Sequence, residues 1–451
     1  MTPTKFIQAL LAATAILAGG AAAAFAGVSA QEASALKSTL MPLGGERAGN
    51  KDGTIPAWDG GYAKAPAGYV SGQPRADPFA NEKPLFSITA ANVGRYRDHI
   101  SDGAALLLKK FPTFRMDVYA THRTASAPQW VYDNTLKNAT SAQTYNGGLA
   151  FKDAIGGVPF PMPKDGFEAA WNMEFVWRGV TYYFPAKSYA VTSNGEPILV
   201  AQVKNWEQSP YWARGGKFSG LAEMYRSRTI GPPQKNGEEL VGRRKFPDGA
   251  SDQSWQYLPG QRRVRKAPSI GYDEPNFFLS GIGQFDEYRG FSGPLNRYNW
   301  KLVGKREMYI PYNNNRYYLQ KDATVIGPHH INPGFVRWEL HRVWVVEATL
   351  ATGKRNVVAK RRFYLDEDTW YPVNIDEWDA QGAYWRFLMD LPMVAAELPG
   401  VIAPSQVLYD FKLNEYAPYF QIGETDKQVQ FLPLLPESFF TPDAVASEAV
   451  R

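Results

Sequence analysis

The chain has 451 residues, a formal net charge of +5 at pH 7 and no cysteine. The lack of cysteine excludes disulfides, cysteine nucleophiles and an acylated cysteine anchor. Acidic and basic residues are interspersed, so charge alone gives no indication of nucleic-acid binding. Aromatic residues make up 14% of the chain, with 13 Trp and 25 Tyr, and such side chains favour strands and line apolar cavities. Most of them are expected to serve ordinary packing.

The first thirty residues have the pattern of a secretory signal peptide. Lys5 supplies a basic region, residues 6–24 are apolar and small, and residues 28–30 fit a cleavage site. We expect a cut after Ala30, with a cut after Ala26 as the alternative. An uncleaved anchor needs about 20 strongly apolar residues, whereas this stretch is mostly Ala and Gly. Export without cysteine favours the periplasm of a Gram-negative bacterium, and no later stretch is apolar for long enough to span a membrane.

The segment after the signal peptide predicts an extended N-terminal arm over residues 31–88, because Gly, Pro and Ala are frequent there. Apolar residues then recur at helical spacing over residues 93–110, after a possible Thr89 cap and before Pro112. This pattern predicts one amphipathic helix. A second helix is expected from Asp165 to shortly before Gly179.

From about residue 182 the apolar residues alternate with period two, which is typical of strands. Asn194-Gly195, between strands expected at 182–192 and 198–206, is the strongest hairpin signal in the chain. The loop-rich residues 268–297 suggest a lid or an insertion. The other expected strands cover residues 222–229, 239–246, 254–258, 261–266, 298–308, 341–350, 357–365, 370–375 and 383–389.

These elements predict an α+β fold that is mainly antiparallel β: a large curved sheet or incomplete β-barrel, with helices covering one side as a lid. Residues 89–451 are expected to form a single elaborated domain after the arm. The alternative is a sugar-binding sandwich joined to an N-terminal module near residues 146–157. No period of 20 to 50 residues repeats, which disfavours propellers and solenoids.

Residues 255–268 combine aromatic strand residues, a turn and a cluster of cations. Pro259 and Gly260 suit the central positions of a type II turn, so the flanking residues should pair as a hairpin. A basic face for anionic head groups or an acidic partner and a solvated strand edge are equally supported interpretations. The cations concerned are Arg262, Arg263, Arg265 and Lys266, with Arg243, Arg244 and Lys245 on the preceding strand.

Recognisable catalytic signatures do not occur: there is no nucleophile elbow, phosphate-binding loop or dinucleotide fingerprint. His329, His330 and His341 are interpreted as surface or loop residues rather than as metal ligands. Residues 366–368, Asp-Glu-Asp, are interpreted as a solvated acidic turn rather than a calcium site. No metal, cofactor or catalytic residue is therefore predicted.

One enzyme hypothesis stays open. Two carboxylates for glycan or ester hydrolysis can be drawn from four acidic residues of one aromatic-rich sheet. They are Glu347, Asp376, Glu377 and Asp379.

Four blocks of the sequence resemble the DUF1329 family. They are LGGERAGNKDGTIPAW at 43–58, YLPGQRRVR at 257–265, HRVWVVE at 341–347 and YLDEDTW at 364–370. The resemblance covers essentially the whole mature chain. It implies a periplasmic protein with a fold similar to the lipoprotein carriers LolA and LolB, an incomplete barrel lidded by helices. It brings no catalytic residues, and the latch residues of the carriers have no matching motif here.

The resemblance also implies transport of hydrophobic cargo beside a resistance-nodulation-division permease and an outer-membrane protein. We therefore expect a periplasmic carrier or chaperone for a lipid-like ligand, with no nucleic-acid partner. A structural adaptor without cargo and the hydrolase are the alternatives. Alternating side chains on the concave face of the sheet are expected to line the cavity. They are Trp255, Tyr257, Trp344, Val346, Trp370 and Trp385.

Overall fold

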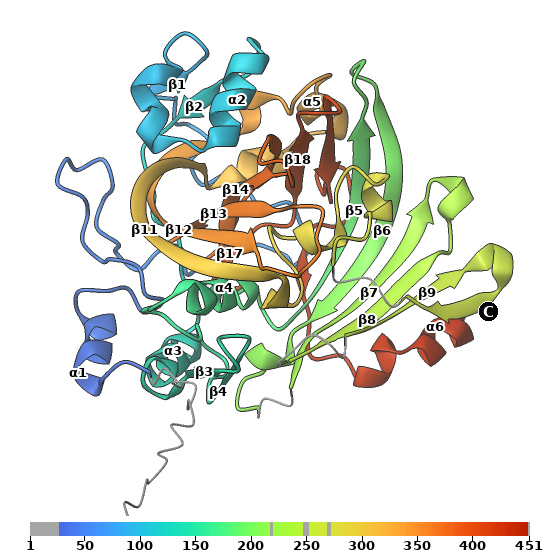
Figure 1. Cartoon of the computed structure of the whole chain (residues 1–451), viewed down its shortest axis with the longest axis horizontal. Helices are drawn as coiled ribbons and strands as arrows, with labels where there is room; N and C mark the ends of the chain where they lie inside the picture. The colour runs from blue at the N-terminus through green and yellow to red at the C-terminus, as the bar shows by residue number, and fades with distance from the viewer. Residues whose placement is uncertain (1–26, 217–219, 247–251, 268–271, 450–451) are drawn as a thin grey trace, which may run out of the picture.

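The structure is a computed structural model that describes residues 27–216, 220–246, 252–267 and 272–449 (Figure 1). One large sheet dominates this part of the chain. In the described residues the sheet has 16 strands, and the strands at the two ends of its path, β1 and β10, do not pair with each other. The expected mainly antiparallel, open sheet is confirmed.

The strands are introduced here in the order in which they lie side by side. They are β1 (Phe86–Ile88), β2 (Met116–Val118), β12 (Trp338–Leu350), β13 (Lys360–Asp366), β14 (Pro372–Trp378), β15 (Tyr384–Asp390), β18 (Gln406–Asp410), β19 (Glu415–Tyr419), β5 (Thr181–Val191), β6 (Pro197–Gln208), β7 (Leu221–Gly231), β8 (Glu239–Lys245), β9 (Gln253–Leu258) and β10 (Arg263–Lys266). In addition, β11 (Tyr298–Pro311) pairs with β12 and β20 (Gln430–Phe431) pairs with β5. Two small hairpins lie outside this sheet: β3 (Gln143–Tyr145) with β4 (Ala150–Lys152), and β16 (Met393–Ala395) with β17 (Gly400–Ile402).

The expected hairpins and meanders are present. Asn194-Gly195 lies between β5 and β6, and Gly195 has a φ of +88°, a conformation that glycine adopts without a steric penalty. Strands β7 to β10 form one meander and β12 to β15 another. The turn expected at Asp248-Gly249 lies outside the described residues.

The turn at Pro259-Gly260 differs from the expected type II turn. Residues Pro259–Gln261 form one 3-10 turn, and the left-handed residue is Arg262, with φ 47° and ψ 40°, rather than Gly260. The loop between β9 and β10 is therefore four residues long, and Leu258 pairs with Arg263. The hairpin itself is confirmed, whereas its turn type was wrong.

Helices are few, and most are short. In the described residues they are α1 (Ala30–Ala33), α2 (Asp102–Lys110), α3 (Gln129–Ser141), α4 (Gly166–Glu174), α5 (Asp322–Val325) and α6 (Pro442–Ala449). The helix expected from Asp165 is confirmed as α4. It begins directly after Asp165, whose carboxylate caps it by accepting a hydrogen bond from Glu168 N at 2.9 Å. None of these helices is long and apolar enough to cross a membrane.

The single helix expected over residues 93–110 is wrong, since a 3-10 helix (Val93–His99) precedes α2. The break lies at Ser101, whose hydroxyl caps α2 by accepting from Ala104 N at 3.1 Å. The first backbone N–H groups of α2, from Asp102 and Gly103, donate to the Asp376 carboxylate at 3.0 and 2.8 Å. In a helix continuous through Ser101 these N–H groups would form the hydrogen bonds of the helix itself, and Asp376 would lose two of its donors.

The segment from residue 38 to residue 85 contains no helix or strand, and parts of it are built into the core. Met41, Leu43, Ile55 and Trp58 are all buried. Leu43 O accepts a hydrogen bond from the indole of Trp370 at 2.9 Å. The arm is thus held by a strand hairpin that lies more than 300 residues further along the chain.

Residues 272–297 occupy the concave side of the sheet. Figure 1 shows this yellow segment between the long strands β5 to β7 and the strands β11 to β14. It contains three 3-10 turns and buries Phe278, Leu279, Phe285 and Phe291 in the main hydrophobic core. Meanwhile α2 packs against β14 and β15, α4 against β11 and β12, and α6 against β8 to β10.

Candidate functional site

A cavity lies between the concave face of β6 to β9 and the 272–297 segment. The space between its lining atoms, with the open mouth and the solvent in it included, is about 730 Å³. One wall consists of residues of β6 to β9 and of Asp252 just before β9: Asn205, Glu207, Glu223, Tyr225, Arg226, Ser227, Leu240, Arg244, Asp252 and Ser254. The covering side consists of Phe278, Phe285, Tyr288 and Ser292 of the 272–297 segment, together with Tyr419 and Phe420 at the end of β19. The cover is thus mostly aromatic and the wall on the sheet is mostly polar. No described α-helix contributes to this lining.

The two faces of β9 show which residues can reach the cavity. Ser254 lines it, so Trp255 and Tyr257, one and three residues later, point to the opposite face. There they pack with Phe440 and Val445 of the C-terminal segment in a second small core. Two of the six expected lining residues therefore belong to the convex side.

The other four expected lining residues lie in separate places. Trp344 stacks on Trp370 with ring centroids 6.1 Å apart, Val346 is fully buried in the main core, and Trp385 donates to Asp410 at 2.8 Å. None of the six lines the cavity. The structure does not bring them together as one surface.

A network of buried charges crosses one end of the cavity, with Arg289 at its centre. Its guanidinium donates to the carboxylate of Glu207 and, at 3.0 Å, to Glu223. Arg244 then joins Glu223, at 3.3 Å, to Glu174 of α4, at 2.6 Å. Because α4 reaches the network through Glu174, this helix closes a second compartment beside the first.

Two tyrosine hydroxyls also donate hydrogen bonds to the Glu207 carboxylate. Tyr288 donates to Glu207 at 2.7 Å, and Tyr182 donates to the other oxygen. Burial raises the pKa of Glu207 well above its usual value, and the neighbouring Glu223 adds to the effect. Burial likewise raises the pKa of Glu174, and that of Asp252 to about 6. Arg289 and Arg244 pair with Glu207, Glu223 and Glu174, whereas Arg178, which lines the second compartment, donates to the backbone carbonyl of Glu174 at 3.1 Å.

Asn205 is the exception among the polar residues of the cavity wall. Its side-chain oxygen accepts from Ser227 at 2.6 Å, whereas its amide nitrogen has no partner although the residue is 3% exposed. A buried N–H without an acceptor costs about 1–3 kcal/mol. An acceptor on a bound molecule would remove this cost.

The four carboxylates of the hydrolase hypothesis have separate partners. Asp376 accepts from the N-terminus of α2 and from Tyr364 and Tyr384. Glu377 follows it on β14, so it points to the other face, toward Arg361 at 3.0 Å. Glu347 pairs with Lys360 and Arg362, and Asp379 with Lys412. No two of them face each other across the described cavities.

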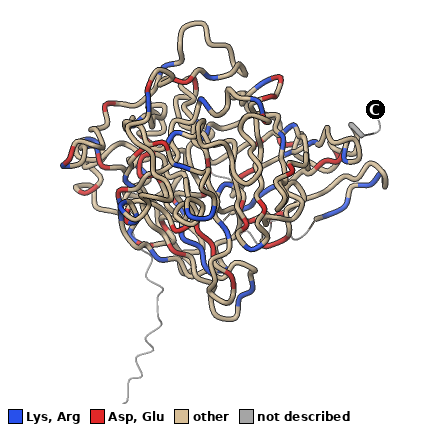
Figure 2. The backbone as a smooth tube through the Cα atoms, turned by 90° about the horizontal axis from the view of Figure 1, so that it is seen from above, with Lys and Arg blue, Asp and Glu red and all other residues tan. Residues whose placement is uncertain are grey.

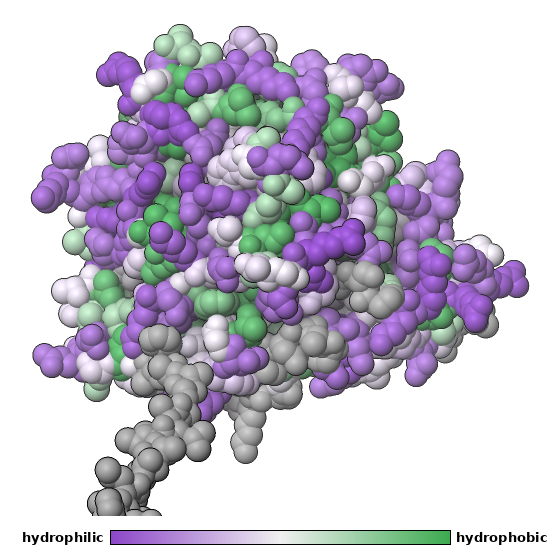
Figure 3. Space-filling view, viewed as in Figure 1, coloured by the Kyte–Doolittle hydropathy of each residue, from purple (hydrophilic) through white to green (hydrophobic). Residues whose placement is uncertain are grey.

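The basic cluster lies at the tip of the sheet. Arg262, Arg263, Arg265 and Lys266 are all exposed, so alternation does not bury half of them. Figure 2 shows cations on this protruding hairpin near the C-terminus, and Figure 3 shows that this end of the molecule is hydrophilic. Arg243 instead donates to Phe440 O at 3.3 Å and Arg244 belongs to the cavity network. Arg243 and Arg244 therefore do not belong to the exposed basic cluster with which the sequence pattern had grouped them.

A second buried ionic centre was missed, because residues 366–368 were interpreted as a solvated turn. Asp366, Glu367 and Asp368 are 0%, 2% and 1% exposed. The partners of the last two come from distant segments: Arg123 donates to Asp368 at 2.6 and 2.9 Å, and Lys305 to Glu367 at 2.8 Å. Acids adjacent in sequence suggest solvation, whereas here cations from β11 and from the segment before α3 surround them.

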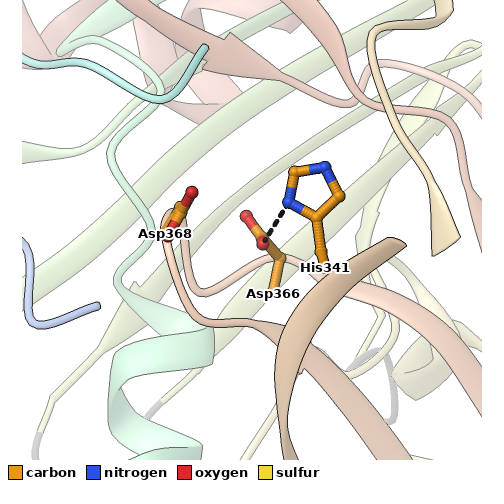
Figure 4. Close-up of side chains that lie close together, drawn as sticks. All are labelled: His341, Asp366 and Asp368. Carbon is orange, nitrogen blue, oxygen red and sulfur yellow. Dashed lines mark ion pairs between the residues drawn. The ribbon is translucent and has the colours of Figure 1, made fainter. Parts of the chain in front are cut away.

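His341 belongs to the same centre, so its interpretation as a surface or loop residue was also wrong. It lies on β12, is 1% exposed and faces Asp366 and Asp368 (Figure 4). Its Nε2 is 3.1 Å from Glu339 and its Nδ1 is 3.9 Å from Asp366 Oδ1. His330 is buried as well, with its Nε2 at 2.8 Å from Thr113 Oγ1.

Comparison with known proteins identifies the family. The model of the family described as "Protein of unknown function (DUF1329)" matches residues 87–446. The chain belongs to the DUF1329 family. The uncharacterized protein PA3922 of Pseudomonas aeruginosa strain PAO1 is 35% identical to it over 450 residues, covering 94% of this chain and 95% of that protein.

Solved structures cover 62% of this DUF1329 chain. A putative outer membrane lipoprotein-sorting protein domain from Vibrio parahaemolyticus matches at 13% identity over 98% of its own length, with a TM-score of 0.44. A DUF1329 family protein from Desulfovibrio piger matches at 13% identity over 97% of its length, also with a TM-score of 0.44. The LolA superfamily protein NE2245 from Nitrosomonas europaea matches at 10% identity over its whole length, with a TM-score of 0.38.

Proposed function

We propose that the protein is a non-enzymatic periplasmic carrier that shields an amphiphilic, lipid-like molecule in the cavity under the 272–297 segment. The cavity itself is the observation that supports this proposal most strongly. Phe278, Phe285 and Phe420 provide an apolar surface on the covering side, where acyl or isoprenoid chains would leave water. Each buried methylene contributes about 0.8 kcal/mol before the ordering costs of binding.

The polar end of the cavity favours an uncharged head group. Glu207 and Glu223 pair there with Arg289 and Arg244, and the amide N–H of Asn205 has no partner. A hydroxyl or carbonyl oxygen of the ligand would accept from it. A free carboxylate would meet Glu207 and Glu223 instead, so we expect a fatty alcohol ester or a monoacylglycerol to bind more tightly than the fatty acid of equal length.

Two neighbouring residues of β8 provide a matched test. Leu240 lines the cavity and is 5% exposed, whereas Val241 packs on the convex side with the C-terminal segment and is 1% exposed. Truncation of either to alanine destabilises the fold by about 1–4 kcal/mol. Only Leu240→Ala removes ligand contacts, so only this variant should lose affinity, by about tenfold or more.

The assay is displacement of a fluorescent lipid probe by 1-monopalmitoylglycerol or palmitate, together with native mass spectrometry of the protein taken from the periplasm. Copurified lipid, and weaker binding by Leu240→Ala than by Val241→Ala, are the expected results. A protein that is always empty and ignores the probe contradicts the carrier. Equal losses in the two variants contradict the location of the site.

We further propose that the β9–β10 hairpin docks the carrier on an anionic surface, such as lipid head groups beside a permease or an outer-membrane protein. The four exposed cations at its tip support this docking role, since each contributes about 1 kcal/mol near an anionic membrane. A structural adaptor without cargo would use the same hairpin, and it differs from the carrier in leaving the cavity empty.

A further inference from the structure

The buried centre around His341 has a feature that the cavity does not explain. Asp366 is fully buried, yet among the described residues its Oδ2 accepts one side-chain hydrogen bond, from Thr369 at 2.6 Å, and its Oδ1 has no hydrogen-bond partner. Among the described residues, His341 is its only ion-pair partner, at 3.9 Å. A buried carboxylate with so few donors is stabilised either by a proton or by a positive charge beside it.

Donor atoms converge on this point. One ligand atom each of His341, Asp366 and Asp368 lies within 4.8 Å of the other two (Figure 4). The ring of Tyr312 lies against that of His341, with centroids 4.1 Å apart, and its buried hydroxyl also lacks a partner.

The surrounding residues orient these donors as the outer shell of a metal site does. A metal-bound histidine usually gives its other ring N–H to a carboxylate, and His341 Nε2 contacts Glu339 in this way at 3.1 Å. Glu339 is itself fixed by His122 N and Asn313, at 2.8 and 2.9 Å. Arg123 holds Asp368 with two hydrogen bonds, and a carboxylate retains further lone pairs for a metal.

We propose that His341, Asp366 and Asp368, with Tyr312 as the fourth donor, bind one first-row divalent metal ion, zinc by preference. One imidazole and a few oxygens suit zinc, whereas calcium takes six to eight oxygen donors. Two ligand atoms of a tetrahedral zinc are roughly 3.4 Å apart, close to the 3.9 Å between His341 and Asp366. The site is buried on all sides, so the role of the metal is structural.

The metal would join the arm to the sheet. The backbone carbonyl of Asp366 accepts from the backbone N–H of Trp370 at 2.8 Å, and Trp370 adopts a left-handed φ of 68° that a residue with a side chain seldom adopts. From this turn the Trp370 indole binds Leu43 O, while Arg123 donates to Glu46 O at 2.6 Å. Three of the four sequence blocks that carry the family resemblance thus meet at one centre.

The test uses tag-free, full-length protein purified without chelators, because histidine tags bind zinc. Inductively coupled plasma mass spectrometry should find about one zinc per chain, falling below roughly 0.1 in Asp366→Asn. Asp390→Asn is the matched control, since Asp390 is a buried carboxylate with one unpartnered oxygen and lies outside this centre. It should keep its zinc. Cobalt substitution of the wild type should give the visible bands of a tetrahedral site, lost in Asp366→Asn.

A second measurement covers the case in which Asp366→Asn does not fold. The unfolding temperature of the wild-type protein should fall by several degrees in chelator and return with equimolar zinc. Three results overturn the proposal: metal-free protein that zinc does not stabilise, zinc retained equally by Asp366→Asn, or stability that follows pH and not metal, in which case a proton alone occupies the centre.

Discussion

Arg289→Met removes the central cation of the cavity network and keeps a side chain of similar length. Arg289 has a positive φ of 54°, and methionine meets the same backbone strain there, so this contribution cancels. The substitution leaves Glu207 with two tyrosine donors and without its ion-pair partner, while Glu223 keeps Arg244. The consequence is one buried carboxylate that has lost its salt bridge.

Breaking a buried pair in this way costs about 3–5 kcal/mol. For a chain of this length, a loss of 4 kcal/mol lowers the unfolding temperature by roughly 4–5 °C. The loss should shrink as pH falls. In the variant, which lacks the arginine, the pKa of Glu207 in the folded state lies even further above its pKa in the unfolded state. The folded variant therefore keeps a proton that the unfolded chain releases, and its stability falls as pH rises from the unfolded pKa to the folded pKa.

Thermal unfolding by circular dichroism between pH 5 and pH 8 measures both effects. Arg289→Met/Glu207→Gln should regain at least half of the loss at pH 8, because glutamine carries no charge to compensate. A shift below 1 °C for Arg289→Met, or no recovery in the double variant, would refute the reasoning that the network is held by its central cation.

Three further predictions concern other parts of the molecule. Burial raises the pKa of Asp390 to about 8, so the native state binds a proton that the unfolded chain loses above its usual pKa, and stability falls as pH rises toward 8. Asp390→Asn should therefore stabilise the protein more at pH 8 than at pH 5, by about 1.4 kcal/mol per unit of pKa shift. Equal effects of the substitution on urea unfolding at the two pH values would contradict this. Charge reversal of Arg262 and Arg263 to glutamate should leave stability within about 0.5 kcal/mol and weaken sedimentation with phosphatidylglycerol vesicles by about thirtyfold or more; unchanged sedimentation would exclude docking by this hairpin. Ser29 caps α1 through a capping box with Glu32. Signal cleavage after Ala26 keeps this cap, whereas cleavage after Ala30 removes it. The intact mass of the mature protein should therefore correspond to a chain beginning at Gly27, and a chain beginning at Gln31 would contradict this preference.

Local signals in the sequence predicted the hairpins and meanders well. Glycine turns and period-two alternation depend on neighbouring residues, as at Asn194-Gly195 between β5 and β6. Helix α3 escaped detection because its buried side includes Thr135 and Asn138 together with Val131 and Ala139. A buried helix face that is half polar gives no hydrophobic period.

The face of the sheet that lines the cavity could not be read from any single strand. Both faces of β9 are covered, the concave one by the 272–297 segment and the convex one by the C-terminal segment, so aromatic residues occur on each. Alternation identifies two faces but not which of them is concave. The same limit applies to Asp368, whose ion-pair partner Arg123 is distant in sequence.

The hydrogen bond between Trp370 and Leu43 joins two residues that are 327 positions apart in the sequence. At a synthesis rate of roughly 5–20 residues per second, the arm waits about 16 to 65 s before its binding turn leaves the ribosome. During this interval Met41, Leu43, Ile55 and Trp58 have no native core to enter. The arm is therefore among the last segments to find its place, and until then its apolar residues are open to any factor that keeps a newly made chain unfolded.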